Sequence, residues 1–152
     1  SLILVEAEGE VNVVRDYDLS LPELTADPDQ LIQALLNITG NALQALRENT
    51  KQTQPPQIIL RTRAQRQFTI GAIRHRLVLR LDIIDNGPGI PPSLIDSIFY
   101  PMVTGRASGS GLGLSISQDI IHLYHGLIEC ESRSGQTIFS IFLPLESGHD
   151  SR

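Results

Sequence analysis

The chain contains 152 residues and carries a formal net charge of −5; 41% of its residues are hydrophobic and 19% are charged. This length and balance predict one globular domain, and the acidic charge argues against nucleic acid as the main partner. The single cysteine, Cys130, excludes an internal disulfide, and no apolar run is long enough to span a membrane, so we expect a cytoplasmic domain without membrane contact.

Composition also predicts where the folded domain begins and ends. Residues 1–10 form an apolar and then acidic lead-in, and residues 146–152 a flexible tail, which leaves residues 11–145 as the domain. Because Ser1 opens the chain without an initiator methionine, we expect the domain to be part of a longer protein.

A strand is predicted first, over residues 11–17, and a long helix follows it. Asp27 is a typical N-cap, Pro28 suits the first helical position, and Gln30 completes a capping box with Asp27. The helix should continue to Arg47, because its apolar residues recur on one face: Leu31, Leu35, Ile38, Ala42 and Leu46.

Two hairpins are expected further along the chain. Residues 57–69 and 76–85 are predicted strands around a tip at residues 70–75, and residues 127–133 and 136–143 form a closing hairpin. Apolar and polar residues alternate in these strands, so one face of the sheet should be buried and the other wet.

Two shorter helices are predicted over residues 91–98 and 112–125, and Gly126 should end the second of them. Each helix has one apolar stripe and each strand one apolar face. The pattern therefore predicts a two-layer α/β (α+β) sandwich, with helices on one face of a mixed sheet and the other face largely exposed to water.

Asn37 and Asn41 lie four residues apart in the first predicted helix, so their side chains share one side of it. An amide carbonyl oxygen is a suitable ligand for Mg²⁺, which is usually bound together with substrate phosphates. The alternative is that both are surface asparagines without a ligand.

The sequence Asp85-Asn86-Gly87-Pro88-Gly89-Ile90 follows an apolar strand directly. A carboxylate accepts hydrogen bonds but cannot donate one, so Asp85 would favour the 6-amino group of adenine over the 6-oxo group of guanine. Gly87 and Gly89 would let the backbone approach the base closely. The alternative is an ordinary turn, because Asn-Gly and Pro-Gly are turn sequences.

Three glycines alternate at Gly109, Gly111 and Gly113, just before the last predicted helix. Without a Cβ atom, their backbone N–H groups can approach an anion, and the helix N-terminus adds a partial positive charge. Arg106 would donate to a terminal phosphate or, alternatively, would only be solvated. Together with the two motifs before it, this loop predicts an ATP site.

The segment from Phe99 to Ser110 contains large apolar residues with no helix or strand period, and it is predicted as a lid that orders on nucleotide binding. Alternatively, these residues anchor a surface loop in the core. His122 and His125 should be exposed on the polar face of their helix. The arginines of residues 57–85 indicate a solvated face or, alternatively, a docking surface for an acidic partner.

In this order the motifs resemble the ATP-binding domain of the GHKL superfamily, which includes gyrase, Hsp90, histidine kinases and MutL. Residues 36–42 resemble its N box, residues 85–89 its first glycine box and residues 109–114 its second. Residues 99–102 stand where histidine kinases have an F box. Residues 135–137 resemble the last box, whose threonine supports the adenine-binding aspartate. The resemblance covers nearly the whole chain and implies a Bergerat fold.

The resemblance also implies the residues of the site. Asn41 would hold Mg²⁺, and Asn37 and Arg106 would complete a catalytic set with it. The residues expected to contact ATP are Asn37, Asn41, Ala42, Asp85, Gly87, Gly89, Ile90, Thr104, Arg106, Gly109, Ser110, Gly111, Leu112, Gly113, Leu114 and Thr137.

One position separates the branches of the superfamily. In the Hsp90 and MutL branches a glutamate at the position of Asn37 acts as general base on water, and an amide has no basic lone pair for that role. This favours the histidine kinase branch, and residues 15–24 and 99–106 are similar to the nitrogen-regulation sensor kinases within it.

That resemblance implies several partners. ATP would phosphorylate a histidine on a separate dimerisation (phosphoacceptor) domain of the same protein, for transfer to a response regulator, under control of the PII signal protein. Residues 1–10 would then lead in from the dimerisation domain. This fragment would be a monomer and the whole protein a homodimer.

Three features depart from the family pattern. Gly40 stands where relatives carry a larger residue, Gln44 replaces a lysine, and none of the four histidines lies in a phosphoacceptor sequence. Two other functions stay open: a nucleotide-dependent interaction or phosphatase-control module without chemistry of its own, and an ATP hydrolase, which Asn37 disfavours.

Overall fold

A computed structural model of the chain describes residues 11–24, 26–49, 54–100 and 112–145. The elements are β1 (Asn12–Asp16), α2 (Pro28–Glu48), β2 (Gln57–Ile70), β3 (Ile73–Asp85), α3 (Pro92–Ile95), α4 (Leu112–Leu123), β4 (Leu127–Arg133) and β5 (Gln136–Pro144). The lead-in, the tail and most of the expected lid lie outside the described residues.

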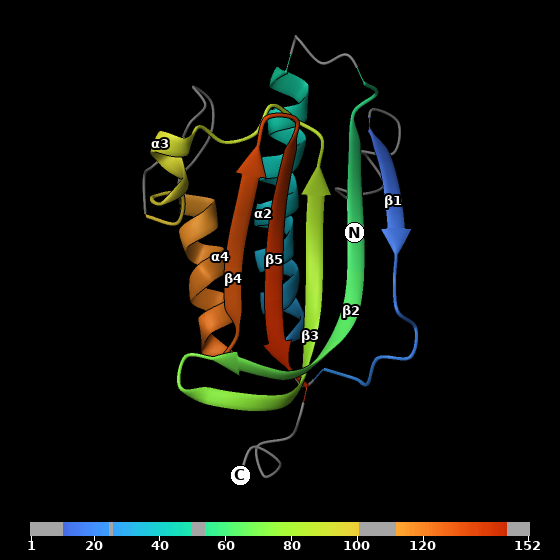
Figure 1. The fold of residues 1–152 in the computed structure, drawn as a ribbon, viewed down its shortest axis with the longest axis vertical. Helices are drawn as coiled ribbons and strands as arrows, with labels where there is room; N and C mark the ends of the chain where they lie inside the picture. Colours follow the sequence, from blue (N-terminus) through green and yellow to red (C-terminus); the bar gives the residue numbers. More distant parts are fainter. Residues whose placement is uncertain (1–10, 25, 50–53, 101–111, 146–152) are drawn as a thin grey trace.

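The strands form one sheet in the order β1-β2-β3-β5-β4. β1 pairs with β2 in parallel, and the other three pairs are antiparallel. α2 and α4 lie side by side on one face of this sheet (Figure 1). The mixed sheet with helices on one face confirms the predicted fold class. In the described part of the chain, no helix is both long and apolar enough to cross a membrane.

The core lies between the sheet and the two long helices. Ala34 and Ile38 of α2 are fully buried against strand residues such as Ile58, Ile83 and Phe139, which are at most 1% exposed. Burying a large aliphatic or aromatic side chain stabilises the folded state by about 1.5–3 kcal/mol. This layer therefore fixes α2, and with it the two asparagines, against the central strands.

The start of α2 differs from the predicted capping box. The Asp27 carboxylate accepts a hydrogen bond from the Asp29 N–H at 2.9 Å, as expected of an N-cap. The Asp27 N–H, however, donates to the hydroxyl of Tyr124 at 3.0 Å, and that hydroxyl donates to Oε1 of Gln30 at 2.5 Å. A tyrosine from the far end of the chain is thus inserted between the two partners of the predicted box.

The end of α4 also differs from prediction. His125, and not Gly126, has the left-handed backbone conformation, with φ of 63°. Gly126 is needed for space, because a Cβ atom there would overlap the carbonyl oxygen of Phe142. Its N–H donates to the carbonyl of Ile121 at 2.9 Å and closes the helix end.

The outer face of the sheet, opposite the helices, is less exposed than predicted. β2 and β3 extend to Ile70 and Ile73, so the turn between them is shorter than the expected tip. The long hairpin bends across the lower end of the sheet in Figure 1. Within its first strand, Gln67 has the left-handed backbone conformation, with φ of 53°. Phe68 then stacks on Phe142 with ring centroids 4.5 Å apart. Phe142 is only 2% exposed as a result.

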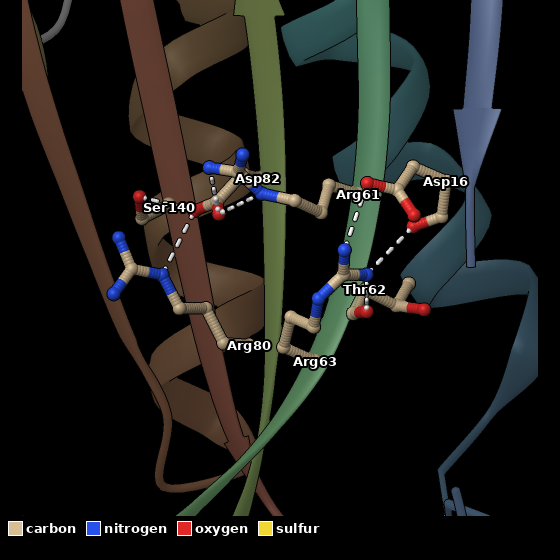
Figure 2. Close-up of polar contacts among 7 residues, drawn as sticks. All are labelled: Asp16, Arg61, Thr62, Arg63, Arg80, Asp82 and Ser140. Atoms are coloured by element: carbon tan, nitrogen blue, oxygen red, sulfur yellow. Dashed lines mark hydrogen bonds and ion pairs between the residues drawn. The ribbon is translucent and has the colours of Figure 1, made fainter. Parts of the chain in front are cut away.

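A polar network covers the middle of the same outer face (Figure 2). The Asp82 carboxylate is 1% exposed and accepts hydrogen bonds from Ser140 at 2.6 Å, Arg80 at 3.0 Å and Arg61 at 3.0 Å. Burial by itself raises the pKa of Asp82, but the hydrogen bonds from Ser140, Arg80 and Arg61 more than offset it, so the pKa lies below its usual value. The network joins β2, β3 and β5.

We predict that Asp82→Asn lowers the free energy of unfolding at neutral pH by about 2 kcal/mol, the scale of hydrogen bonds to a charged group. Because the folded-state pKa is below the usual 3.8, the stabilisation is complete above that pH and is lost as the pH falls further. Urea unfolding should therefore show the parent and the variant converging below pH 3.8.

Asp16→Asn is the matched control for Asp82→Asn. Asp16 pairs with Arg63 at 2.8 Å, but both side chains are 47% exposed, so its loss should cost less than about 1 kcal/mol. A difference between parent and Asp82→Asn that stays constant from neutral to acid pH would contradict the role given to this carboxylate.

We also predict that Gly40→Ala stabilises the chain by about 1 kcal/mol, the difference in helix propensity between the two residues. A Cβ atom at Gly40 would meet no atom within 4 Å, so nothing opposes the gain. Gly126→Ala, where the Cβ would overlap a carbonyl, should instead destabilise strongly. Equal effects of the two changes in urea unfolding would refute this reading of the two glycines.

Candidate nucleotide-binding site

The predicted base-binding aspartate lies where the sequence indicated, at the end of β3. Asp85 is 3% exposed, and its Oδ1 accepts a hydrogen bond from the N–H of Gly87 at 2.9 Å. A Cβ atom at Gly87 would lie 2.9 Å from that same oxygen. Glycine is therefore required for the chain to turn so closely around the carboxylate.

Gly89 and Ile90 continue this turn against the hairpin of β4 and β5. Gly89 has φ of 88°, and a Cβ there would overlap the carbonyl oxygen of Arg133. The N–H of Ile90 donates to Oγ of Ser132 at 2.7 Å. Gly89 is thus held by close packing on the Arg133 backbone, and Ile90 by its hydrogen bond to Ser132. The Ile90 side chain packs on the core.

Thr137 lies directly opposite Asp85 in the antiparallel pairing of β3 and β5, and it is 4% exposed. Its hydroxyl is 2.8 Å from that of Ser132. Sequence reasoning missed Ser132, although the two-residue turn at Ser134 and Gly135 already implies that Ser132 and Thr137 are paired. A chain of hydroxyls therefore connects the strand position opposite Asp85 to the Ile90 backbone.

Asn86 is a second residue that the sequence did not single out. Its side chain accepts from the N–H of Gln57 at 2.8 Å and donates to the carbonyl of Pro55 at 2.9 Å. These two bonds attach the turn after β3 to the start of β2. The turn that carries Asp85 is consequently fastened on both sides, to β2 by Asn86 and to β4 by Ile90.

The predicted metal-binding helix lies beside this turn. The nearest α2 atoms to a Cβ placed at Gly87 belong to Leu46, at 3.6 Å, and to Ala45, at 3.8 Å. Asn41 is one helical turn before Ala45 and is half-buried, as is Asn37 one turn further back. Ala42 is 2% exposed and belongs to the core. The fold thus brings the first two sequence motifs together.

The third motif is only partly described. Thr104, Arg106, Gly109, Ser110 and Gly111 lie outside the described residues, and at Leu112 and Gly113 only the helical backbone is described. α4 does begin at Leu112, and Leu114 is 7% exposed in the core. At the other end of the expected lid, Phe99 packs edge-on against Phe139 with ring centroids 6.2 Å apart. Phe99 is therefore anchored in the core, whereas Tyr100 beside it is 63% exposed.

Other candidate sites receive less support. His122 and His125 are exposed, as expected, and the described residues contain no cluster of three metal-ligating side chains. Burial, with the charges of Asp85 and Glu131, raises the pKa of the Cys130 thiol to about 12, so it stays protonated at neutral pH. A cavity of about 270 Å³ beside α2 includes none of the predicted site residues; its lining is Tyr17, Ile32, Leu35, Leu36, Thr39, Leu60, Thr62, Leu81 and Ile83.

Comparison with known proteins shows the family to which the chain belongs. Residues 26–147 match the family described as histidine kinase-, DNA gyrase B-, and HSP90-like ATPase. The sensory histidine kinase/phosphatase NtrB of Proteus hauseri is 54% identical over 145 residues, which are 95% of this chain and 40% of the relative. The chain thus spans less than half the length of that relative.

Solved structures of histidine kinases have a similar fold. The nucleotide-free catalytic domain of the histidine kinase ThkA is 25% identical with a TM-score of 0.74, over 95% of this chain and 86% of that one. Full-length ShkA in complex with AMPPNP is 23% identical with a TM-score of 0.72, over 97% of this chain and 28% of that one. The chain belongs to the histidine kinase-, DNA gyrase B- and HSP90-like ATPase family, and within it the chain is similar to NtrB and to the catalytic domain of ThkA.

Proposed function

We propose that this domain binds ATP with Mg²⁺ and donates the γ-phosphoryl group to a histidine on a dimerisation domain of the same protein. The observation that carries the proposal is the buried Asp85 carboxylate, which lies in a glycine turn beside the helix of Asn37 and Asn41. A carboxylate in this position is an acceptor for the amino group of adenine.

The residue types in the candidate site are suited to ATP and Mg²⁺. A Cβ atom would lie 2.9 Å from Oδ1 of Asp85 at Gly87 and would overlap the carbonyl oxygen of Arg133 at Gly89, so the close turn after this carboxylate needs glycine at both positions. Asn41 and Asn37 offer half-buried amide oxygens one turn apart, which are hard ligands of the type that Mg²⁺ accepts. When bound, the metal would neutralise charge on the phosphates.

The residue at position 37 favours transfer over hydrolysis. An asparagine cannot remove a proton from water near neutral pH, so the chain has no general base at this point of α2. Phosphoryl transfer depends mostly on positioning and charge neutralisation, which Asn41, Arg106 and the glycines would supply. The attacking group would then come from the partner histidine.

Further partners follow from the similarity to NtrB. We propose that the phosphoryl group passes on to an NtrC-like response regulator and that the PII signal protein shifts the balance toward phosphatase activity. We also propose that the isolated domain is a monomer and that the full-length protein is a homodimer.

Labelled ATP, with a histidine-containing dimerisation domain supplied in trans, tests the proposal. We expect phosphohistidine on the added domain and little free phosphate. Release of phosphate without phosphohistidine would make the chain a hydrolase instead. Nucleotide binding with neither product would leave only a nucleotide-dependent interaction module.

Asp85→Asn should weaken ATP binding by about 1.5–3 kcal/mol, because it removes a hydrogen bond to a charged group. The parent should also prefer ATP over GTP in calorimetry. Asp82→Asn is the matched control, since this carboxylate is equally buried in the same strand but faces away from α2. Equal affinity of the parent for ATP and GTP would show that Asp85 does not select the base.

Asn41→Asp should damage binding of Mg·ATP more than its similar size suggests, because it adds negative charge where phosphate charge must be neutralised. Calorimetry with and without Mg²⁺ measures this effect, and Asn41→Ala shows the loss of the ligand alone. If both variants bind Mg·ATP like the parent, Asn41 is not a metal ligand.

A further inference from the structure

Hydrogen bonds of Ser117 and Tyr124 connect α4 and the residue after it to α2 and its N-cap. The hydroxyl of Ser117 in α4 donates to the carbonyl oxygen of Ala34 in α2 at 2.9 Å, and both residues are 0% exposed. Near the end of α4, the Tyr124 hydroxyl accepts from the Asp27 N–H and donates to Gln30. The first contact is buried in the layer between the helices, and the second lies at the start of α2.

The first contact lies close to the proposed phosphate-binding groups. α2 and α4 run in opposite directions where they lie side by side (Figure 1). Ala34 precedes Asn37 by one helical turn, and Ser117 follows Leu114 by about one turn. The Ser117 bond therefore ties the first turns of α4, which follow the second glycine motif, to the turn of α2 that carries Asn37.

A small slide of α4 would break this contact. One residue of axial shift in a helix is 1.5 Å, enough to separate a hydroxyl from its acceptor. The Ser117 hydroxyl would then lose this bond in a fully buried position, which is costly. Tyr124 restrains the other end of the same helix, so the two contacts together oppose both sliding and swinging.

We propose that Ser117 and Tyr124 are positioning residues. They fix the start of α4 along the axis of α2, opposite Asn37 and Asn41. This rests on the proposed function. The spacing between the N-terminus of α4 and the two asparagines of α2 would decide whether all three phosphates fit at once. Asp85 and the turn after it belong to β3, which neither contact touches, so base recognition does not depend on them.

Calorimetry with Mg·AMP-PNP and Mg·ADP on the 152-residue chain tests the proposal. Ser117→Ala and Tyr124→Phe should each weaken AMP-PNP binding by about 5- to 10-fold, on the scale of one hydrogen bond, and should leave ADP binding within about twofold. Ser117→Thr keeps the hydroxyl that Ser117→Ala removes, so it should keep the preference for AMP-PNP over ADP. Thermal melting of each variant, followed by circular dichroism, sets a temperature for calorimetry at which that variant is folded.

Thr39→Val is the matched control. The Thr39 hydroxyl is also buried in α2, but it donates to the Leu35 carbonyl of the same helix at 2.8 Å. Its loss should lower stability without changing the ratio of AMP-PNP to ADP affinity.

Each outcome has a distinct meaning. If the parent binds neither nucleotide, the proposed function is wrong. If the parent prefers AMP-PNP and both Ser117→Ala and Tyr124→Phe keep that preference, the positioning role is wrong and the proposed function stands. A Thr39→Val variant that loses the preference to the same degree would also overturn the positioning role, since the effect would then follow stability alone.

Discussion

The buried carboxylate of Asp85 is the constraint on which the candidate site depends. It lies at the end of a central strand, where its Oδ1 accepts the Gly87 N–H at 2.9 Å, and the chain must turn immediately around it. That turn excludes a Cβ at Gly87 and at Gly89, and it is fastened to β2 by Asn86 and to β4 through Ile90. The result is a turn beside α2 that is held by hydrogen bonds on both sides of Asp85.

Two buried aspartates of β3 lie on opposite faces of the sheet and have different partners. Asp85 lies on the α2 side of the sheet, where its turn packs against Ala45 and Leu46 of the helix. Asp82, three residues earlier, faces the opposite side and is occupied by Ser140, Arg80 and Arg61. The bent hairpin adds the stack of Phe68 on Phe142 to that outer face. One carboxylate stabilises the sheet, and the other is the one that we propose recognises the base.

Much of this could be predicted from local sequence. The N-cap at Asp27, the strand ending at Asp85 and the two-residue turn at Ser134 and Gly135 all follow from local patterns, and the structure confirms them. Contacts between distant segments could not be predicted in this way. Tyr124 replaced the direct capping box because its hydroxyl reaches α2 from 97 residues away. The left-handed conformation of Gln67 and the stack of Phe68 on Phe142 likewise depend on tertiary packing that no local pattern encodes.

A crystal structure of the chain with Mg²⁺ and AMP-PNP tests the central claim most directly. The account predicts the adenine amino group at hydrogen-bonding distance, about 2.7–3.2 Å, from a carboxylate oxygen of Asp85, with the phosphates between Asn41 and the start of α4. A base bound elsewhere, or one whose amino group points away from Asp85, would contradict it.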